Sequence, residues 1–425
     1  MKRGFYTIMA AQFFSSLADN ALFAVAVDAL KSTGVPAWQV TALVPMFALF
    51  YVVLAPILGE FADAVPKGAV MFYSNAVKVA GCLLMLFGGH PLIAYAIVGL
   101  GAAAYSPAKY GILTELLPTS QLVKANGWIE GLTILSIIAG TLLGGQLVGP
   151  RLGSVMLSIR IPHVELGIHT FDQAAVVCMV VLYAVAAVFN LRIPRTGATL
   201  QSIEGNIGEI VREFSQCNAR LWDDKLGQIS LATTTLFWGV SANLRYIVLG
   251  WAGAALGYSM TSATAMIGVV AIGTAVGAVV AAFTIRLDSA PRVILLLVGM
   301  AALVMCMDAI HSVWAAVPLL VVLGLLGGFV VVPMNALLQH RGHNLMGAGR
   351  SIAVQNFNEQ ASILGVGAAY SLMTRLGLSV YGAIAVFGLF TAGVSLLIEL
   401  WHRRNLRQHP DDVQALLAIA RSDSH

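Results

Sequence analysis

The stretch GEFADAVPKG, residues 59–68, lies between two long apolar runs at residues 38–58 and 69–88. Each run contains about twenty residues, which is the length that an α-helix needs to cross the apolar core of a bilayer. A short charged turn between two such runs is typical of a loop that joins consecutive membrane-spanning helices. This stretch therefore predicts a helical membrane protein, and the same alternation recurs along the whole chain.

The composition indicates an all-α membrane protein. Of the 425 residues, 58% are hydrophobic and only 10% are charged, whereas a soluble domain has roughly 25% charged residues. Hydropathy predicts about twelve transmembrane helices. They cover residues 5–30, 38–58, 69–88, 91–113, 121–148 and 171–192 in the first half, and 226–251, 260–285, 292–310, 313–338, 349–375 and 378–401 in the second.

These spans form two groups of six, separated by a long polar stretch. We expect an N-terminal six-helix bundle over residues 1–193, a cytoplasmic linker over 194–225, a C-terminal six-helix bundle over 226–402 and a cytoplasmic tail over 403–425. The linker is expected to contain an amphipathic helix that lies on the membrane surface. Glycines at 140–145 and 273–277 are expected to permit close contacts between helices.

Basic residues predict the orientation, because loops on the cytoplasmic side carry an excess of Lys and Arg. With the N-terminus inside, the cytoplasmic segments contain Lys2, Arg3, Lys67, Arg192, Arg195, Arg212, Arg220, Lys225, Arg286, Arg292, Arg341, Arg403, Arg404 and Arg407. The opposite side receives Lys31, Arg151, Arg160 and Arg375. Both termini are therefore expected in the cytoplasm.

Asp19 and Arg245 each lie inside a long apolar run, and they are 226 positions apart. Pro107 and Pro333 have the same separation, which indicates two similar halves. Two parallel six-helix repeats, related by an axis along the membrane normal, are typical of the major facilitator fold. Ionisable groups at membrane depth are costly, and they usually face a partner or a water-filled path. An acid and a base at matching positions therefore predict a gate or a substrate site.

The charged loop resembles the signature loop of major facilitator proteins, in which a Gly permits close packing and an Asp caps or pairs with a neighbouring helix. Gly59, Asp63, Lys67 and Gly68 match its outline. Ala64 stands where the signature has a basic residue directly after the Asp, so the match is incomplete. The resemblance implies a role in conformational switching without contact to the substrate. The alternative is an ordinary tight turn with solvated charges.

Four further stretches carry a more specific resemblance: ADNAL (18–22), AYSPAKYG (104–111), PMNALLQ (333–339) and, before Arg245, LFWG (236–239). Together they resemble the bacterial lysophospholipid transporter family of the major facilitator superfamily, over nearly the whole chain. The resemblance implies movement of lysophospholipids, chiefly lysophosphatidylethanolamine, across the inner membrane for reacylation on the cytoplasmic side. It also implies a separate acyltransferase as a functional partner.

The chain departs from this family in an extra polar stretch within residues 150–170 and in the tail after Arg404. Neither departure touches the matched stretches. We expect transport by rocking of the two six-helix bundles around a cavity at the membrane midplane.

Three interpretations of Asp19 and Arg245 follow. A rise of 1.5 Å per residue places Asp19 about 21 Å and Arg245 about 28 Å along their spans, so both are expected towards the outer half of the membrane. They can pair with each other as a gate. Alternatively, Asp19 contacts the ammonium of a headgroup and Arg245 contacts its phosphate, because a planar guanidinium suits a phosphate. A purely structural ion pair is the third interpretation.

Other polar residues at membrane depth are weaker candidates. Asn20 follows Asp19 in the matched stretch, and Asp28 is expected near the outer interface, where a solvated role is an equal alternative. Lys78 is explained by snorkelling or by pairing within its own half. The polar candidates on the cytoplasmic side are Lys109, Tyr110, Asn126, Glu130, Asn356 and Glu359.

Two other classes of function compete with lipid transport. A membrane-bound acyltransferase is disfavoured, because none of the nine His residues has an Asp five positions later to orient a catalytic base. No Gly-rich phosphate-binding loop, metal-ligand cluster or cofactor motif is present in the sequence, and the scattered basic residues give no indication of nucleic-acid binding. A proton-coupled exporter of drugs or small metabolites remains the alternative, with Asp19 as the titrating acid.

Overall fold

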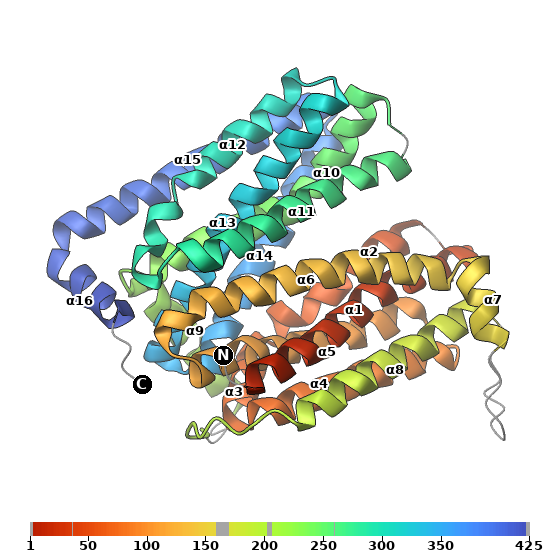
Figure 1. Ribbon diagram of the computed structural model, residues 1–425, viewed down its shortest axis with the longest axis horizontal. Helices are drawn as coiled ribbons and strands as arrows, with labels where there is room; N and C mark the ends of the chain where they lie inside the picture. The colour runs from red at the N-terminus through yellow and green to blue at the C-terminus, as the bar shows by residue number, and fades with distance from the viewer. Residues whose placement is uncertain (1–2, 36, 159–169, 202–205, 259, 422–425) are drawn as a thin grey trace. The chain divides into compact units, whose positions relative to one another are not determined.

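The computed structural model describes residues 3–35, 37–158, 170–201, 206–258 and 260–421. Within these ranges the regular structure is entirely helical (Figure 1). The long helices are α1 (Arg3–Ser32), α2 (Ala37–Val53), α3 (Ala55–Ala64), α4 (Lys67–Leu86), α5 (Pro91–Leu116), α6 (Thr119–Leu147), α8 (Phe171–Leu191), α10 (Gly227–Leu256), α11 (Met260–Thr284), α12 (Leu296–Cys306), α13 (Val313–Met346), α14 (Ala348–Arg375) and α15 (Val380–Gln408). The other elements are α7 (Pro150–Ser158), α9 (Ile207–Asp223), α16 (Pro410–Arg421) and the 3-10 segments η1 (Leu287–Val293) and η2 (Met307–Ala309).

These helices account for the twelve predicted spans. Nine spans in the described part of the chain are long and apolar enough to cross a bilayer, and the pair α2–α3 makes a tenth. The remaining two are α10 and α14, whose 30 and 28 residues exceed the length of a span. Over a membrane-length stretch, neither helix is as apolar as the other ten spans.

The second predicted span is not one straight helix. α2 and α3 are bent by 63° at a break between Val53 and Ala55. Pro56 lies in the first turn of α3. Proline has no N–H to donate to the preceding turn, and its ring crowds the carbonyl four residues earlier, so it ends or kinks a helix. The bend therefore follows from a residue inside the predicted span.

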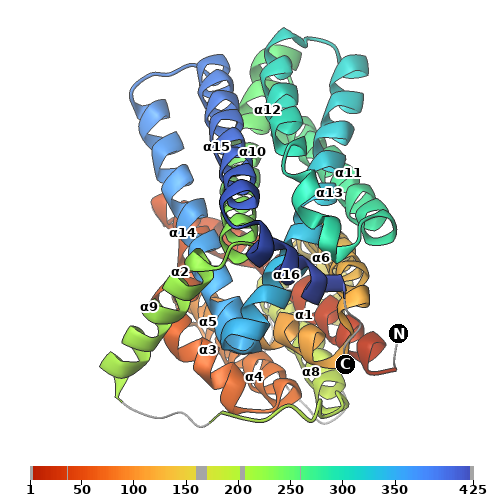
Figure 2. The same ribbon diagram turned by 90° about the vertical axis from the view of Figure 1, so that its left-hand side faces the viewer.

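Two described helices lie outside both the predicted spans and the predicted linker helix. α7 lies in the connection between α6 and α8 (Figure 1), and α16 follows α15 after a break at His409 (Figure 2). Part of the polar stretch that departs from the family, at residues 159–169, lies outside the described residues. In the linker, α9 confirms the expected helix, and its burial alternates as the amphipathic pattern predicts. Its location on the membrane surface stays a prediction.

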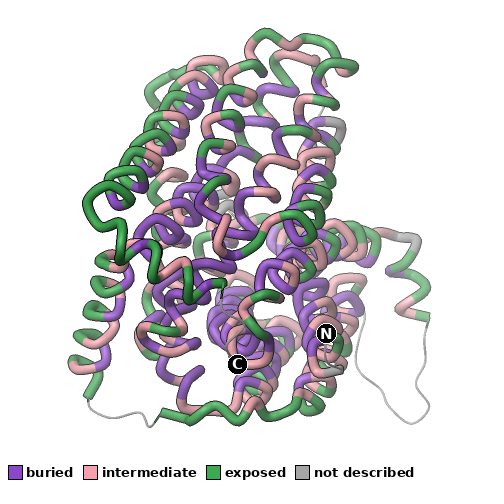
Figure 3. The backbone as a smooth tube through the Cα atoms, turned by 60° about the vertical axis from the view of Figure 1, so that its left-hand side comes forward, coloured by how far each residue is buried: buried purple, intermediate pink, exposed green. Residues whose placement is uncertain are grey.

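The helices divide into two compact units. Unit 1 contains Met1–Leu116, Leu135–Val211 and Ala348–Ala353, and unit 2 contains Leu117–Ile134, Arg212–Gly347 and Val354–His425. The long helices α6 and α14 therefore each contribute to both units. In both units, buried and exposed positions alternate along the helices (Figure 3). Many large hydrophobic side chains are among the exposed ones. Exposed apolar faces of this extent are typical of helices surrounded by lipid.

Unit 1 is built on α1, α4, α5 and α8. α4 packs on α5 and α8, α1 packs on α8, and α2 packs on α5. Glycines permit the closest approaches, as expected for Gly140 in α6. A Cβ at Gly140 would lie 2.6 Å from the Leu17 carbonyl of α1, and a Cβ at Gly144 would also collide with that helix.

Unit 2 has its closest helix pair at α11 and α13, which run side by side (Figure 1). Gly273 and Gly277 of α11 face Gly324 and Gly328 of α13, so two glycine pairs with four-residue spacing meet each other. A Cβ on any of the four would collide with a backbone carbonyl of the other helix: Val321 for Gly273, Leu325 for Gly277, Val270 for Gly324 and Thr274 for Gly328. The expected close contacts at residues 273–277 are confirmed, and the structure adds their partners. Such pairs let two backbones touch, which drives helix association within a membrane.

Candidate functional site

Asp19 lies near the middle of α1 and is held by two neighbouring helices of unit 1. Its Oδ2 accepts a hydrogen bond from Lys78 Nζ of α4 at 2.8 Å. Its Oδ1 accepts one from Tyr183 Oη of α8 at 2.7 Å. The Asp19 side chain remains 18% exposed, whereas that of Lys78 is only 1% exposed. The carboxylate is therefore the accessible end of a buried ion pair.

Lys78 is surrounded by groups that stabilise a cation. Its Nζ donates to Ser15 Oγ at 3.0 Å, and it lies 5.1 Å from the ring centroid of Tyr105 and 5.4 Å from that of Tyr183. Aromatic faces attract ammonium groups at such distances. Ser15 Oγ in turn donates to Asn75 Oδ1 at 2.8 Å. A buried charge with one partner removed is strongly destabilising, so Lys78 and Asp19 depend on each other.

Glycines make room for this cluster between α4 and α5. A Cβ at Gly101 of α5 would lie 2.6 Å from Lys78 Cγ and 2.7 Å from the Ser74 carbonyl. A Cβ at Gly81 of α4 would lie 2.8 Å from the Ala94 carbonyl. Only glycine lets the two backbones approach closely enough for Lys78 to lie beside Tyr105.

Asp19 pairs with Lys78 in unit 1, 59 positions along the chain. The similarity of the two halves had instead suggested Arg245 as its partner. Pairing of Lys78 within its own half, one of its two expected explanations, is confirmed. The sequence identifies both charges, since both residues lie inside apolar spans. It does not show which helices lie next to each other.

Arg245 lies in α10 of unit 2, and its guanidinium is exposed. Its Nε donates to the Ala242 carbonyl at 2.8 Å, and its Cζ lies 5.8 Å from the ring centroid of Tyr246. Tyr246 stacks on Tyr370 of α14, with 6.3 Å between the ring centroids. Asp19 and Arg245 belong to different units, so a gate formed by the two stays a prediction.

The other two residues of the predicted outer site, Asn20 and Asp28, lie on α1. Asn20 Nδ2 donates to the Ser16 carbonyl of its own helix at 2.8 Å. Asp28 forms a side-chain hydrogen bond with Asp172 in the first turn of α8. Asp28 therefore contacts a second carboxyl group. This contact was not expected for a carboxylate surrounded by water.

The charged loop forms a compact polar cluster within unit 1, and Asp63 is its centre. Asp63 Oδ1 accepts hydrogen bonds from Lys67 Nζ at 2.8 Å and from the Gly349 N–H at 2.6 Å. Its Oδ2 accepts one from the Arg350 N–H at 2.9 Å. Gly349 and Arg350 are in the first turn of α14, whose N–H groups have no partner within the helix. Asp63 therefore caps α14 and pairs with Lys67, as the signature loop implies.

The glycines of the loop allow this arrangement. A Cβ at Gly59 would lie 2.8 Å from the Ala353 Cβ of α14, and one at Gly68 would lie 3.0 Å from the Asn190 carbonyl. Lys67 Nζ also pairs with Glu115 of α5 at 3.2 Å. An ordinary turn with solvated charges is thereby excluded, because Asp63 and Lys67 are buried.

The cytoplasmic-side candidates divide between the units. In unit 1, Lys109 Nζ lies 4.0 Å from the ring centroid of its neighbour Tyr110. In unit 2, the Asn126 and Gln339 side chains exchange two hydrogen bonds, of 2.9 and 3.0 Å, between α6 and α13. Asn356 lies half-buried in α14. These candidates are therefore distributed over both units.

Glu130 and Glu359, the two acidic candidates, come close to each other in unit 2. Both are buried. Glu359 accepts a hydrogen bond from Gln355 Nε2 at 2.8 Å and another from Thr234 of α10. The positional likeness of the two residues in the sequence thus corresponds to spatial proximity between α6 and α14.

A buried ion pair that the sequence did not predict lies at the start of α10. Arg341 of α13 donates from Nε to Asp224 Oδ1 at 3.1 Å and from its terminal nitrogen to Oδ2 at 2.6 Å. Asp224 Oδ1 also accepts from the Gly227 N–H at 2.7 Å, which caps α10. Arg341 was assigned only to the positive cytoplasmic side, and the bidentate pair depends on the fold.

The Arg341→Ala substitution is expected to destabilise the protein by about 3–5 kcal/mol, because it leaves the buried Asp224 carboxylate without a counter-charge. Thermal unfolding of the detergent-solubilised protein measures the effect. The Arg403→Ala substitution is the matched control, since Arg403 pairs with Glu399 on an exposed helix face and such pairs contribute little. Equal melting temperatures for the two variants would contradict the prediction.

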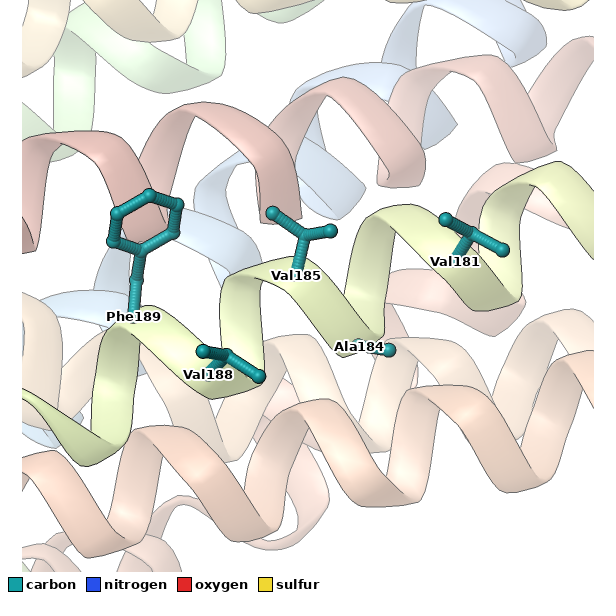
Figure 4. Close-up of a pocket in the computed structure, with 5 residues that line it drawn as sticks. All are labelled: Val181, Ala184, Val185, Val188 and Phe189. Atoms are coloured by element: carbon teal, nitrogen blue, oxygen red, sulfur yellow. The ribbon is translucent and has the colours of Figure 1, made fainter.

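An apolar pocket lies on the surface of α8 and is lined by Val181, Ala184, Val185, Val188 and Phe189 (Figure 4). These residues come from two turns of one helix, and they offer no polar side chain. Phe189 stacks on Phe14 of α1, with 5.9 Å between the ring centroids. The pocket has the character of a lipid-facing helix surface, so the Asp19 cluster is the stronger candidate site.

Comparison with known proteins agrees with this architecture. A family model of the Major Facilitator Superfamily matches residues 8–365. The major facilitator transporter FucP, solved in the outward conformation, has a TM-score of 0.69 at 13% identity and covers 95% of this chain and 99% of its own. The human organic anion transporter TETRAN also has a TM-score of 0.69 at 13% identity, over 95% of this chain and 100% of its own. Both show the fold, and the predicted fold class is confirmed.

Two relatives are much more similar in sequence. The lysophospholipid transporter LplT of Photorhabdus laumondii subsp. laumondii is 36% identical over 404 residues, which are 95% of this chain and 96% of the relative. LplT of Yersinia enterocolitica is 40% identical over 383 residues, 89% of each chain. The chain therefore belongs to the Major Facilitator Superfamily and, within it, to the family of the lysophospholipid transporters.

Proposed function

We propose that the protein transports lysophospholipids, chiefly lysophosphatidylethanolamine, to the cytoplasmic leaflet of the bacterial inner membrane for reacylation there. The observation that carries this proposal is the 36–40% identity to proteins named lysophospholipid transporters, over 89–96% of their length. Similarity over a whole chain includes the elements that form the site, not only the fold. The protein itself performs no chemistry in this proposal, and a separate acyltransferase consumes the lysolipid.

The arrangement of charges in the described residues supports a polar lipid as the substrate. Asp19 presents a partly exposed carboxylate at the middle of α1, where an ammonium can approach it. Arg245 presents an exposed guanidinium on α10, and its planar fork suits a phosphate. In the proposal both residues contact the headgroup or close the outer side after it has passed. A single acyl chain remains in the lipid while the headgroup moves.

The transport cycle is proposed to be a rocking movement of two bundles, residues 1–193 and 226–402, with both termini in the cytoplasm. The Asp63 cluster supports this mechanism because its bonds to α14 involve only the first turn of that helix, and they can break without unfolding it. Gly59, Asp63, Lys67 and Gly68 then act as a conformational switch that does not contact the substrate.

Reconstituted liposomes test the proposal. Wild-type protein is expected to move labelled lysophosphatidylethanolamine into a pool that albumin cannot extract, and Arg245→Ala is expected to lower the initial rate about ten- to a hundredfold. The reason is the loss of a hydrogen-bonded charge contact of about 1.5–3 kcal/mol. Arg375→Ala, which removes another exposed guanidinium of unit 2, is the matched control and is expected to keep the wild-type rate.

Two outcomes of this assay would count against the proposal. Wild-type protein that moved soluble drugs but no lysolipid would favour the alternative exporter. Uptake that stopped when an ionophore collapsed the proton gradient would favour the proton-coupled alternative. An Arg245→Ala variant with the wild-type rate would remove Arg245 from the mechanism.

A further inference from the structure

Two buried hydrogen-bond donors flank Lys78 without partners among the described residues. Tyr105 Oη and Asn75 Nδ2 are fully enclosed and make no hydrogen bond. Tyr105 is 3% exposed and Asn75 is 0% exposed. Buried polar groups are nearly always satisfied, because an unsatisfied one bears its full desolvation penalty. Two such donors beside one buried cation therefore indicate a group that accepts from them.

The geometry brings these donors to the same ammonium. Lys78 Nζ lies over the Tyr105 ring, 5.1 Å from its centroid. Asn75 precedes Lys78 by three positions on α4, which places the two on one face of the helix. Ser15 connects them, since it accepts from Lys78 Nζ at 3.0 Å and donates to Asn75 Oδ1 at 2.8 Å. A cation, an N–H and an O–H thus surround one small region of α4 and α5.

Such a set of donors fits an anion with several acceptor oxygens. The phosphate of a lysophospholipid headgroup is such an anion. Charge-assisted hydrogen bonds to phosphate oxygens are stronger than bonds between neutral groups. The single anion now at this place is Asp19, which accepts from Lys78 at 2.8 Å and is itself partly exposed. Asp19 is therefore both the present partner of the lysine and the group that meets an incoming ligand first.

We infer that Lys78, Tyr105 and Asn75 bind the phosphate of the lysophospholipid headgroup once it has moved past Arg245, while Asp19 leaves Lys78 and binds the headgroup ammonium. This inference rests on the proposed function. The exchange conserves charge, because one intramolecular ion pair is replaced by two pairs with a zwitterion of zero net charge. A neutral exchange avoids the cost of bringing an uncompensated charge to membrane depth.

The inference makes headgroup charge decisive. Lysophosphatidylethanolamine satisfies both Lys78 and Asp19, whereas lysophosphatidylglycerol has a phosphate and no ammonium and leaves Asp19 without a counter-charge. The wild-type protein is therefore expected to prefer the zwitterionic lysolipid. If the Asp19–Lys78 pair is purely structural, the preference for one headgroup over the other should not depend on either side chain.

The Tyr105→Phe substitution tests the phosphate side without removing any hydrogen bond of the folded protein. It is expected to keep the wild-type melting temperature and to raise the KM for lysophosphatidylethanolamine about tenfold, which corresponds to about 1.4 kcal/mol. Tyr73→Phe, an exposed position on α4, is the matched control and is expected to leave KM unchanged. A wild-type KM for Tyr105→Phe would overturn the role of its hydroxyl group.

Headgroup selectivity tests the exchange itself. Asp19→Asn is expected to raise the ratio of lysophosphatidylglycerol to lysophosphatidylethanolamine uptake about tenfold, and Lys78→Met is expected to lower it. Equal losses for both lipids, with the wild-type ratio retained in both variants, would overturn the inference and leave the proposed function standing. Failure of the wild-type protein to move either lipid would instead contradict the proposed function.

Discussion

The Gly277→Leu substitution is expected to prevent unit 2 from folding. The Gly277 Cα faces the backbone of α13, and a Cβ there would collide with the Leu325 carbonyl and lie 2.9 Å from the Leu325 Cα. A backbone cannot move aside as the end of a flexible side chain can. We expect a loss of more than about 4 kcal/mol, which is a large part of the roughly 5–15 kcal/mol of a typical domain.

Gly268→Leu provides the matched control for this prediction. Gly268 lies on the same helix, and a Cβ there would meet nothing within 4 Å, so this variant is expected to keep the wild-type yield and melting temperature. Fluorescence-detected size-exclusion chromatography of the detergent-solubilised variants measures both. A monodisperse Gly277→Leu protein with the wild-type melting temperature would show that α11 and α13 do not touch through their glycines.

The Asp63→Ala substitution is expected to lower lysolipid uptake by at least an order of magnitude. It removes the cap from α14, which contributes about 0.5–2 kcal/mol, and a carboxylate at a helix N-terminus, which contributes up to about 2 kcal/mol. Together these terms amount to as much as about 4 kcal/mol, which shifts the population of the capped state by up to about 1,000-fold. In the proposed rocking cycle the cap forms and breaks once per turnover, so a shift of this size is expected to slow one half of the cycle.

Uptake into liposomes measures the effect, and Asp412→Ala, at an exposed position of α16, is the control. Asp63→Asn is expected to retain part of the activity, since an amide oxygen can accept from one of the two N–H groups of α14. Wild-type uptake by Asp63→Ala would mean that the loop is only a packing element. Equal loss of uptake in the control would point to a general effect of removing a carboxylate.

The sequence predicted the transmembrane helices well, because a long apolar run shows that a helix is surrounded by lipid and not by water. The run at residues 171–192 became α8 almost residue by residue. The bend between α2 and α3 was missed, since Pro56 lies inside a run that is apolar throughout. The glycines at 273–277 predicted a close contact, but spacing along one helix does not reveal Gly324 and Gly328 as the opposite surface.

The sequence identified the charged residues of the candidate site, but it did not identify which of them form ion pairs. Asp19 was identified because a carboxylate inside an apolar run is costly, and Lys78 was expected to snorkel or to pair within its own half, but the sequence did not identify the two as partners. Which lysine meets which carboxylate depends on the neighbours of α1 in the fold, and these are set by the contacts of α4 and α8. Asp63 was expected to cap a helix, but only the structure identifies α14 as that helix.

The polarity of α10 and α14 has a consequence for biosynthesis. A charged side chain at the centre of a helix adds roughly 2.5–3.5 kcal/mol to its transfer from the insertion channel into lipid. α14 contains Glu359 with Asn356 and Gln355 nearby, and α10 contains Arg245. Neither helix can partition into the bilayer efficiently as a lone segment, so each is expected to wait beside the translocon until later helices emerge and shield it.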